Sequence, residues 1–364
     1  GGVSTNTGTI PSKALREAVL YLSGFRQRNL YGAGYRLKET VTIEDLAFRA
    51  NHIIKNEIEI VEDQMARNRI DLIHGVARFV DPHRLLVQQA GTSTNHFAHV
   101  IVIAVGTEPS RPADVPFNER TIIDTDGLIT LKHLPTSIVI VGGGVIGTEY
   151  ASILAMIGVS VILIDKRPRL LEFVDAQIID ALQQQMKDIG VTIYHEEEAV
   201  AIREESDGQV TVSLTHRPPV TATTLLYAVG RIGATKHLNL DAVGLTPDAR
   251  GRVIVNDHFQ TAVPHIYAAG DVIGFPALAS TSMQQGRHAA CHAFDYPDHT
   301  DTGLLPYGIY TIPEISTVGR NEEELTKEEI PYAVGIAHYR EIARGQLIGD
   351  DTGMLKLLFH RHTR

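Results

Sequence analysis

Residues 137–147 of the chain read SIVIVGGGVIG, an apolar run of strand type that leads directly into three spaced glycines. Gly142 permits a tight turn, Gly144 lets backbone N–H groups approach a phosphate, and Gly147 lets a helix pack closely on the strand. The N-terminus of that helix carries partial positive charge, which favours an anionic group. The stretch therefore predicts a strand, a glycine-rich turn and a helix that together hold a pyrophosphate.

A second apolar run, Val159–Ile164, leads to Asp165, which lies 23 residues after Gly142. An acid at this point accepts hydrogen bonds from the ribose hydroxyls of a dinucleotide. Lys166 and Arg167 follow at once. The carboxylate favours NAD(H), whereas the adjacent cations attract a 2′-phosphate and favour NADP(H). The mixed charges indicate a site that accepts both nucleotides, with a solvated charged loop as the alternative.

Length and composition limit what surrounds this unit. A chain of 364 residues is too long for one core and is typical of two domains with part of a third. The net charge of −10 argues against nucleic acid or an anionic membrane as a partner, and the apolar runs are too short to span a bilayer. The single cysteine, Cys291, excludes an internal disulfide and a thiolate zinc cluster. We expect a soluble, cytoplasmic protein.

Strand and helix patterns alternate on both sides of the glycine-rich turn, which predicts an α/β fold. Helical spacing covers Ala14–Ser23 and, after a capping box at Thr42–Asp45, a stretch reaching about Arg69. A further helix is expected to begin at about Ala279. Strand patterns cover Asp71–Gln89, His99–Ala104, Val191–Tyr194, Val210–Leu214, Thr224–Tyr227, His265–Ala268, Tyr310–Pro313 and Met354–Phe359.

Five segments, in this order along nearly the whole chain, resemble the two-dinucleotide flavoprotein disulfide reductases. They are Gly1–Lys13, Ala104–Thr107, Ala228–Arg231, Thr261–Asp271 and Tyr310–Glu314. Within that family, the phrase from Asn6 to Lys13 is most similar to the transhydrogenase branch. The resemblance implies two Rossmann-like domains and a homodimer or higher homo-oligomer. It implies an NAD(P) domain (114–231) inserted in a split FAD domain (1–113 and 232–303), and the start of a truncated α+β dimer-interface domain (304–364).

The sequence departs from the family at the redox-active segment. Family disulfide reductases carry Cys-x4-Cys, and the matching positions here hold Ser4 and Thr9. Hydroxyl groups form no disulfide, so the dithiol route is excluded. Hydride can then pass only between flavin and nicotinamide, or from flavin to an outside acceptor.

The resemblance also implies the site residues. Lys13 is expected near flavin N5, where a cation stabilises reduced flavin, and paired with Glu149; together they form the catalytic pair, with two solvated helix charges as the alternative. The expected FAD contacts are Lys13, Ala77, Gly106, Asp271, Ala277, Leu278, Ala279 and Ser280. The expected NAD(P) contacts are Gly142, Gly143, Gly144, Val145, Ile146, Gly147, Glu149, Asp165, Lys166, Arg167 and Gly230.

The implied activity is that of an FAD-dependent, Si-specific NAD(P)+ transhydrogenase. One nicotinamide-dinucleotide fingerprint predicts a ping-pong mechanism in which NADPH and NAD+ use the same pocket in turn. Two alternatives stay open: an NAD(P)H dehydrogenase that reduces a quinone, and a non-catalytic nucleotide-binding or redox-sensing module. The family places its FAD pyrophosphate fingerprint before the position of Gly1. In a chain that truly begins there, we expect weak or no FAD retention, whereas the inserted domain should still bind NAD(P).

Other candidates are weaker. His288 and His292 are four residues apart on an expected helix with Cys291 between them. A metal pair is conceivable, but without a third ligand at suitable spacing packed or solvated histidines are favoured. The sequence therefore predicts no metal site.

Overall fold

The computed structural model describes residues 2–32, 34–298 and 304–363. These residues form two compact units, and each is described by itself. The first unit contains the described residues of Gly1–Ile10, Ile53–Ser110 and Arg231–Leu305. The second contains those of Pro11–His52, Arg111–Gly230 and Pro306–Arg364. The four-part division expected from the sequence stays a prediction, because the units follow contacts rather than domain families.

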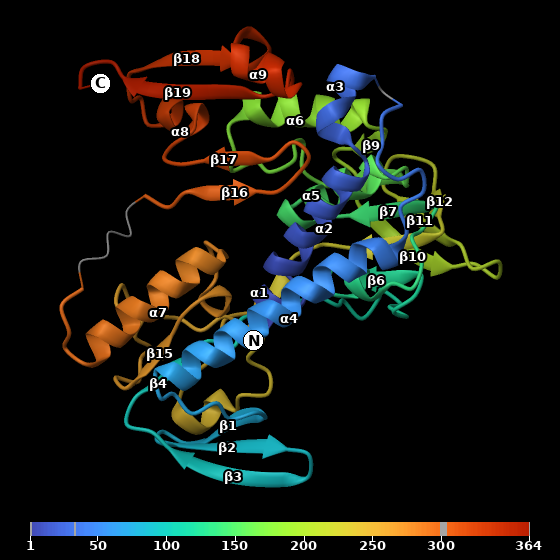
Figure 1. The fold of residues 1–364 in the computed structure, drawn as a ribbon. Helices are drawn as coiled ribbons and strands as arrows, with labels where there is room; N and C mark the ends of the chain where they lie inside the picture. Colours follow the sequence, from blue (N-terminus) through green and yellow to red (C-terminus); the bar gives the residue numbers. More distant parts are fainter. Residues whose placement is uncertain (1, 33, 299–303, 364) are drawn as a thin grey trace. The chain divides into compact units, whose positions relative to one another are not determined.

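The second unit is built on a parallel sheet of strand order β6-β13-β7-β8-β9. Its strands are β6 (Ile122–Asp124), β7 (Ser137–Val141), β8 (Ser160–Ile164), β9 (Val191–Tyr194) and β13 (Thr224–Tyr227). Figure 1 labels β6, β7 and β9 of this sheet. The chain leaves β7 towards β8 on one side and reaches β13 on the other. The carboxyl edge of β7 is therefore a topological switch point, where α/β sheets bind ligands.

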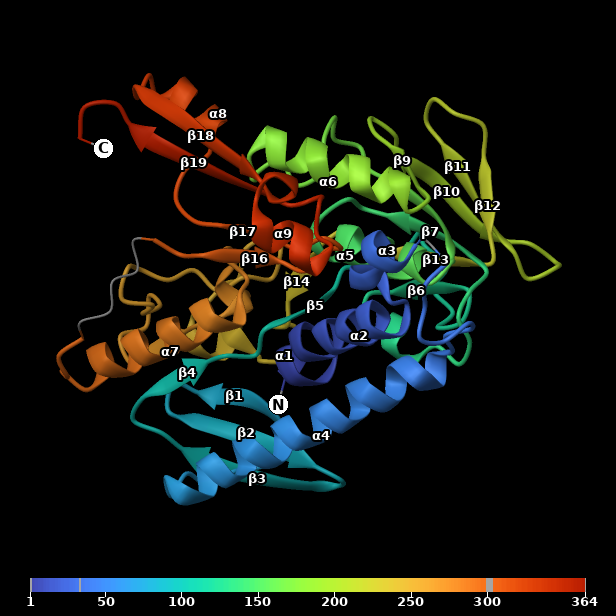
Figure 2. The ribbon, with the colours of Figure 1, turned by 45° about the horizontal axis from the view of Figure 1, so that its top comes forward.

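Two apolar layers cover this sheet because its central strands are apolar on both faces. On one face, Ile138, Ile140 and Leu163 belong to the same core as residues of α5 (Val145–Met156) and α6 (Ala176–Asp188). On the other face, Val139, Val141, Ile164 and Leu225 share a core with a three-stranded antiparallel sheet. That sheet consists of β10 (Ala199–Glu204), β11 (Val210–Leu214) and β12 (Val220–Ala222), which lie side by side in Figure 2.

Further elements complete the second unit. They are α2 (Thr9–Leu22, from Pro11 onwards), η1 (Phe25–Gln27), α3 (Arg28–Tyr31), the start of α4 (Ile43–Arg67), η2 (Gly127–Thr130), β16 (Tyr307–Ile309), β17 (Ile315–Thr317), α8 (Glu322–Lys327), β18 (Tyr332–His338), η5 (Tyr339–Glu341), α9 (Ala343–Ile348) and β19 (Met354–His360). The capping box predicted at the start of α4 is present: Thr42 N–H donates to Asp45 Oδ2 at 2.8 Å, and Asp45 N–H donates to Thr42 Oγ1 at 3.4 Å.

The first unit has its own core, which contains Phe79, Ile101, Leu240 and Ile266. Its elements are α1 (Gly2–Asn6), the rest of α4, β1 (Val76–Asp81), β2 (Arg84–Gln89), β3 (Thr92–Phe97), β4 (Ile101–Ile103), β5 (Thr107–Pro109), β14 (Arg231–Gly233), η3 (Leu240–Val243), β15 (Ile266–Ala268), η4 (Asp271–Ile273) and α7 (Ala279–Ala293). Strands β1, β2 and β3 form an antiparallel sheet, β4 pairs in parallel with β15, and β5 pairs antiparallel with β14.

Two expected strands are wrong. Residues 72–74 are exposed coil, because the ladder with β2 begins only at Val76. The segment Tyr310–Pro313 lies between β16 and β17 and joins neither. Its backbone donors are taken by α5 instead: Tyr310 N–H donates to Glu149 Oε1 at 2.8 Å, and Ile312 N–H donates to Ser152 Oγ at 3.0 Å. A segment whose N–H groups bond to side chains has no need of a strand partner.

Candidate functional site

The glycine-rich turn after β7 needs glycine at its ends for steric reasons. Gly142 has φ of 109°, and a Cβ there would lie 2.6 Å from the carbonyl oxygen of Ala228, which follows β13. A Cβ on Gly147 would overlap the carbonyl oxygen of Gly142. The first and third glycines therefore allow the turn and the helix to close on the sheet.

The middle glycine has a different surrounding. Gly144 is the N-cap of α5, has φ of −75°, and a Cβ there would meet nothing within 4 Å. Gly144 has no side chain that could cap α5, so the first N–H groups of the helix are left to be satisfied by solvent or by a ligand. The helix α5 has 12 residues, and the space beside Gly144 at its N-terminus is open. Such a space fits the pyrophosphate of a dinucleotide.

Asp165 lies beside this turn at the end of β8, and all of its acceptor positions are in use. Its Oδ2 accepts from the N–H of Gly143 and from Nη2 of Arg167, the latter at 2.7 Å. Its Oδ1 accepts from the backbone N–H and from Nε of Arg167, both at 2.8 Å. An ionised carboxylate has about four lone-pair positions, so the guanidinium must move before a ribose hydroxyl can bind here.

The electrostatics of this pair are strongly coupled. Burial raises the pKa of Asp165, but hydrogen bonds from Arg167 and Gly143 outweigh it and leave the pKa below its ordinary value. The hydrogen bond to Asp165 in turn raises the pKa of Arg167. The carboxylate side chain is 4% exposed and the guanidinium side chain 35%, so Arg167 is the partner with room to move. Lys166 between them is exposed.

Lys13 and Glu149 form the ion pair expected from the sequence. Lys13 lies on α2 and Glu149 on α5, and their Nζ and Oε2 atoms are 2.9 Å apart. The Glu149 side chain is 5% exposed, whereas that of Lys13 is 27% exposed. The ring of Tyr310 lies 4.7 Å from the ammonium. A buried carboxylate thus holds one cation in place and leaves it partly open to its surroundings.

Asp271, in the first unit, is the last member of a series of side-chain hydrogen bonds. Nε of Arg231 donates to Thr107 Oγ1 at 2.9 Å, and Thr107 Oγ1 donates to Asp271 Oδ2 at 3.4 Å. Burial raises the pKa of Asp271, against the opposing effects of Arg231 and Thr107. A carboxylate fixed at one oxygen and still half-buried fits a ligand hydroxyl, which is what the sugar-alcohol chain of FAD offers.

The remaining predicted FAD contacts belong to the first unit as well. Ala77 pairs with Val87 in the β1–β2 ladder, and Gly106 has φ of 67°. Residues 277–280 lead into α7, which begins at Ala279 as expected. Lys13 and Glu149 lie in the second unit, so the single FAD site expected to contain residues from both stays a prediction. Gly230, with φ of 82°, follows β13 in the second unit.

Sequence reasoning missed the residues after β9. His195 lies beside the turn of Asp165 and Arg167, and burial lowers its pKa. Arg217 places its guanidinium 4.4 Å from the centre of the Tyr194 ring. The signal was available, because parallel strands end at one edge and the residue after β9 must adjoin the residue after β8.

His288 and His292 of α7 both contact His258, which the sequence analysis did not single out. His258 stacks on His292 with ring centres 4.3 Å apart, and its Nδ1 lies 3.3 Å from Nε2 of His288. Within residues 2–32, 34–298 and 304–363, no three His, Cys, Asp or Glu side chains converge as metal ligands.

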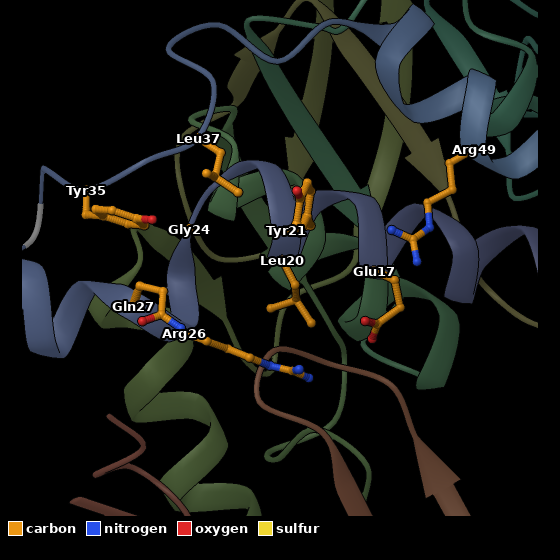
Figure 3. Close-up of a pocket in the computed structure, with 9 residues that line it drawn as sticks. All are labelled: Glu17, Leu20, Tyr21, Gly24, Arg26, Gln27, Tyr35, Leu37 and Arg49. Carbon is orange, nitrogen blue, oxygen red and sulfur yellow. The ribbon is translucent and has the colours of Figure 1, made fainter. Parts of the chain in front are cut away.

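The second unit also has a pocket of about 470 Å³, and none of the predicted site residues lines it. Figure 3 shows the nine residues that line it: Glu17, Leu20, Tyr21, Gly24, Arg26, Gln27, Tyr35, Leu37 and Arg49. They come from α2, the residues after it and α4. In the part of the chain that the structure describes, no helix is long and apolar enough to cross a membrane.

Known protein families and curated proteins are similar to this chain in sequence. Residues 1–286 match the family described as pyridine nucleotide-disulphide oxidoreductase, and residues 305–364 match its dimerisation domain. The chain is 52% identical to a soluble pyridine nucleotide transhydrogenase of Mycobacterium tuberculosis, over 98% of this chain and 77% of that protein. A protein of the same name from Marinobacter nauticus is 42% identical, over 100% and 78%.

Two solved structures have a similar fold. The flavoprotein disulfide reductase RclA of Escherichia coli has a TM-score of 0.85 and 26% identity, over 99% of this chain and 78% of that one. LpdA of Mycobacterium tuberculosis has a TM-score of 0.90 and 24% identity, over 100% and 80%.

Proposed function

The chain belongs to the pyridine nucleotide-disulphide oxidoreductase family, and we propose that it transfers hydride between NADPH and NAD+ with FAD as its cofactor. Relatives of 42% and 52% identity are named soluble pyridine nucleotide transhydrogenase, which supports this activity. The single cysteine supports it further, because a dithiol reductase of this family needs a cysteine pair that this sequence does not have.

The observation that carries the proposal is the closed Asp165–Arg167 pair beside the open space at Gly144. A transhydrogenase with one nicotinamide site must bind NADP(H) and NAD(H) in turn, so it must not reject either. With the pair closed, Asp165 is neutralised and repels a 2′-phosphate less. With the guanidinium moved away, the carboxylate accepts the hydroxyls of an unphosphorylated ribose. One mobile cation thus serves both nucleotides.

The other residues are proposed to hold and orient FAD. Bound FAD supplies a ring that takes up and returns hydride. Asp271 would accept a hydrogen bond from the sugar-alcohol chain, and Thr107 and Arg231 keep its carboxylate in place. Lys13 would place its cation near the ring, held there by Glu149, and the positive charge favours negative charge that develops on a reacting group.

Finer features are proposed on the same basis. The match of residues 305–364 to a dimerisation domain supports a homodimer. The word soluble in the names of the relatives supports a cytoplasmic location. Si-specific hydride transfer stays a prediction from the resemblance.

Stopped-flow measurement of the two half-reactions tests the function. We expect NADPH to bleach the flavin absorbance of the holoenzyme, and NAD+ to restore it at a rate that accounts for turnover. Restoration by a quinone at a rate far above that with NAD+ would instead favour an NAD(P)H dehydrogenase. Purified protein that stays colourless after incubation with FAD would contradict both enzymes and favour a nucleotide-binding module.

A further inference from the structure

The pocket shown in Figure 3 is lined by three segments of the second unit. Its volume of about 470 Å³ is within the usual range of small-molecule sites. The first segment is α2, which contributes Glu17, Leu20 and Tyr21. Residues three and four apart share one face of a helix, so these side chains open to the same side of α2. Leu20 belongs to the core of the unit and anchors this wall.

The second segment follows α2 and is held against its end. Gly24 has φ of 63°, and a Cβ there would lie 2.7 Å from Cδ1 of the Tyr35 ring. The missing side chain of Gly24 thus lets the Tyr35 ring lie directly against the chain. The ring also stacks on Tyr31, with ring centres 5.3 Å apart. Leu37 N–H donates to the carbonyl oxygen of Leu22 at 3.1 Å, which fixes this wall to α2.

The third segment is the start of α4. Leu46 and Ala50 of this helix are buried, and Leu46 belongs to the same core as Leu20 of α2. Arg49 directly precedes Ala50, and Figure 3 shows its side chain extending from α4 towards Glu17. Packing or backbone hydrogen bonds therefore fix all three walls, and the pocket is preformed.

Two arginines give the pocket its positive charge. Within residues 2–32, 34–298 and 304–363, neither the Arg26 nor the Arg49 guanidinium makes an ion pair or a hydrogen bond. Glu17 is the acid of the lining, and its Oε1 accepts from Nη1 of Arg16, which does not line the pocket, at 2.8 Å. Two arginines against one glutamate leave the lining residues with one net positive charge.

This charge favours a ligand with a single carboxylate. A guanidinium presents a fork of N–H donors that matches the two oxygens of a carboxylate, and also the oxygens of a phosphate. One net positive charge balances a monoanion, whereas a phosphate dianion would exceed it and would be repelled more strongly by Glu17. The charge of the lining therefore distinguishes between two anions that arginine alone would accept.

The apolar part of the lining favours a flat ring attached to that carboxylate. It consists of the Tyr21 and Tyr35 rings and the Leu20 and Leu37 side chains. Aromatic rings pack on one another in stacked or edge-to-face arrangements. From this combination we propose that the pocket binds a small aromatic monocarboxylate. The proposal goes beyond hydride transfer, because none of the residues proposed to bind NAD(P) or FAD lines the pocket.

Calorimetric titration of the holoenzyme with naphthoate, an aromatic monocarboxylate, tests the proposal. Naphthamide is the neutral counterpart, and naphthyl phosphate at about pH 8 is the counterpart with two charges. The variant Arg26→Gln/Arg49→Gln removes both positive charges of the pocket. Arg340→Gln/Arg344→Gln is the matched control, because these arginines belong to the same unit and do not line the pocket. All four arginines are exposed, so both variants should keep the unfolding temperature of the wild type.

We expect the wild type and the control to bind one naphthoate per chain, and Arg26→Gln/Arg49→Gln to bind it about tenfold more weakly. Naphthamide and naphthyl phosphate should bind the wild type at least about threefold more weakly than naphthoate. Glu17→Gln should narrow the difference between naphthyl phosphate and naphthoate, because it removes the like charge.

Three results would overturn the proposal. Equal affinity for naphthoate in the two double variants would place the ligand outside the pocket. Absence of saturable naphthoate binding to the wild type would contradict the ligand class, and tighter binding of naphthyl phosphate than of naphthoate would contradict the choice of a monoanion. Each of these results leaves the proposed hydride transfer intact.

Discussion

Nζ of Lys13 and Oε2 of Glu149 lie 2.9 Å apart, although 136 residues separate the two in the sequence. The same carboxylate accepts the N–H of Tyr310 through Oε1 at 2.8 Å. Three segments that are distant in the sequence thus meet at one buried carboxylate. Glu149 lies on α5, whose residues from Gly147 to Met156 are all buried, and its two partners compensate for the burial of its charge. The arrangement fixes the site of one positive charge, and this charge can be removed by mutation.

Lys13→Met is expected to lower the midpoint potential of the bound flavin. Loss of a charge-assisted contact of about 1–3 kcal/mol would disfavour the reduced form, which corresponds to about 20–60 mV for a two-electron couple. Spectroelectrochemical titration measures the shift. Lys13→Arg keeps the charge and should retain most of the potential.

The control for this prediction is a measurement of the unfolding temperature, because Lys13→Met also leaves the buried Glu149 carboxylate without its cation. The double variant Lys13→Met/Glu149→Gln should unfold at a higher temperature than Lys13→Met alone, since it removes the unpaired charge. An unchanged flavin potential in a folded Lys13→Met protein would place Lys13 away from the ring.

Asp165 and Arg167 should have opposite effects on the two nucleotides. Asp165→Ala is expected to weaken the NAD(H) half-reaction and to leave NADP(H) similar or better, because the ribose hydroxyls lose their acceptor. The double change Lys166→Ala/Arg167→Ala should do the reverse. Each lost contact should cost about 1–3 kcal/mol, or roughly 5- to 150-fold in kcat/KM of that half-reaction. Equal losses for both nucleotides in both variants would contradict a shared, two-state site.

The ionised side chain of Asp271 is expected to lower the free energy of unfolding of the protein at neutral pH. Burial raises its pKa, so the folded chain holds the proton more tightly than the unfolded chain, and ionisation at neutral pH disfavours folding. Asp271→Asn is therefore expected to raise the free energy of unfolding of the flavin-free protein at pH 7, by on the order of 1 kcal/mol or less for a partly exposed group. The gain should vanish as the pH falls below the ordinary aspartate pKa of 3.8, where both states are protonated.

Thermal unfolding of both proteins between pH 3 and pH 8 measures this effect, together with FAD titration, in which Asp271→Asn should bind more weakly. A variant that is less stable than the wild type at pH 7 would show that Asp271 stabilises the first unit through Thr107 instead.

Local patterns in the sequence predicted the elements that surround the proposed nucleotide site. The run into Gly142, the helix after it and the acid at the end of β8 follow from spacing and sterics, and each lies where it was expected. The closed Asp165–Arg167 pair did not follow, because charges two residues apart on a loop only form a pair when the backbone turns back on itself. His195 was missed for a similar reason: its neighbours come from another strand, and pairing between strands is not a local property. The segment at Tyr310 has the composition of a strand, and only the tertiary contact with Glu149 shows why it is none.

Gly144 and Gly147 of the turn should respond differently to one added methyl group. Gly147→Ala would overlap the carbonyl oxygen of Gly142, which is backbone and cannot yield, so we expect a loss of about 2–4 kcal/mol in stability or no folded protein. Gly144→Ala meets no atom within 4 Å and has a backbone conformation open to alanine, so stability should stay within about 0.5 kcal/mol of the wild type. The methyl group would instead occupy the space proposed for the pyrophosphate. Calorimetric titration should then show NAD+ and NADP+ both binding at least about tenfold more weakly, since both share this part of the site. Wild-type affinity for both nucleotides in a well-folded Gly144→Ala protein would place the pyrophosphate elsewhere.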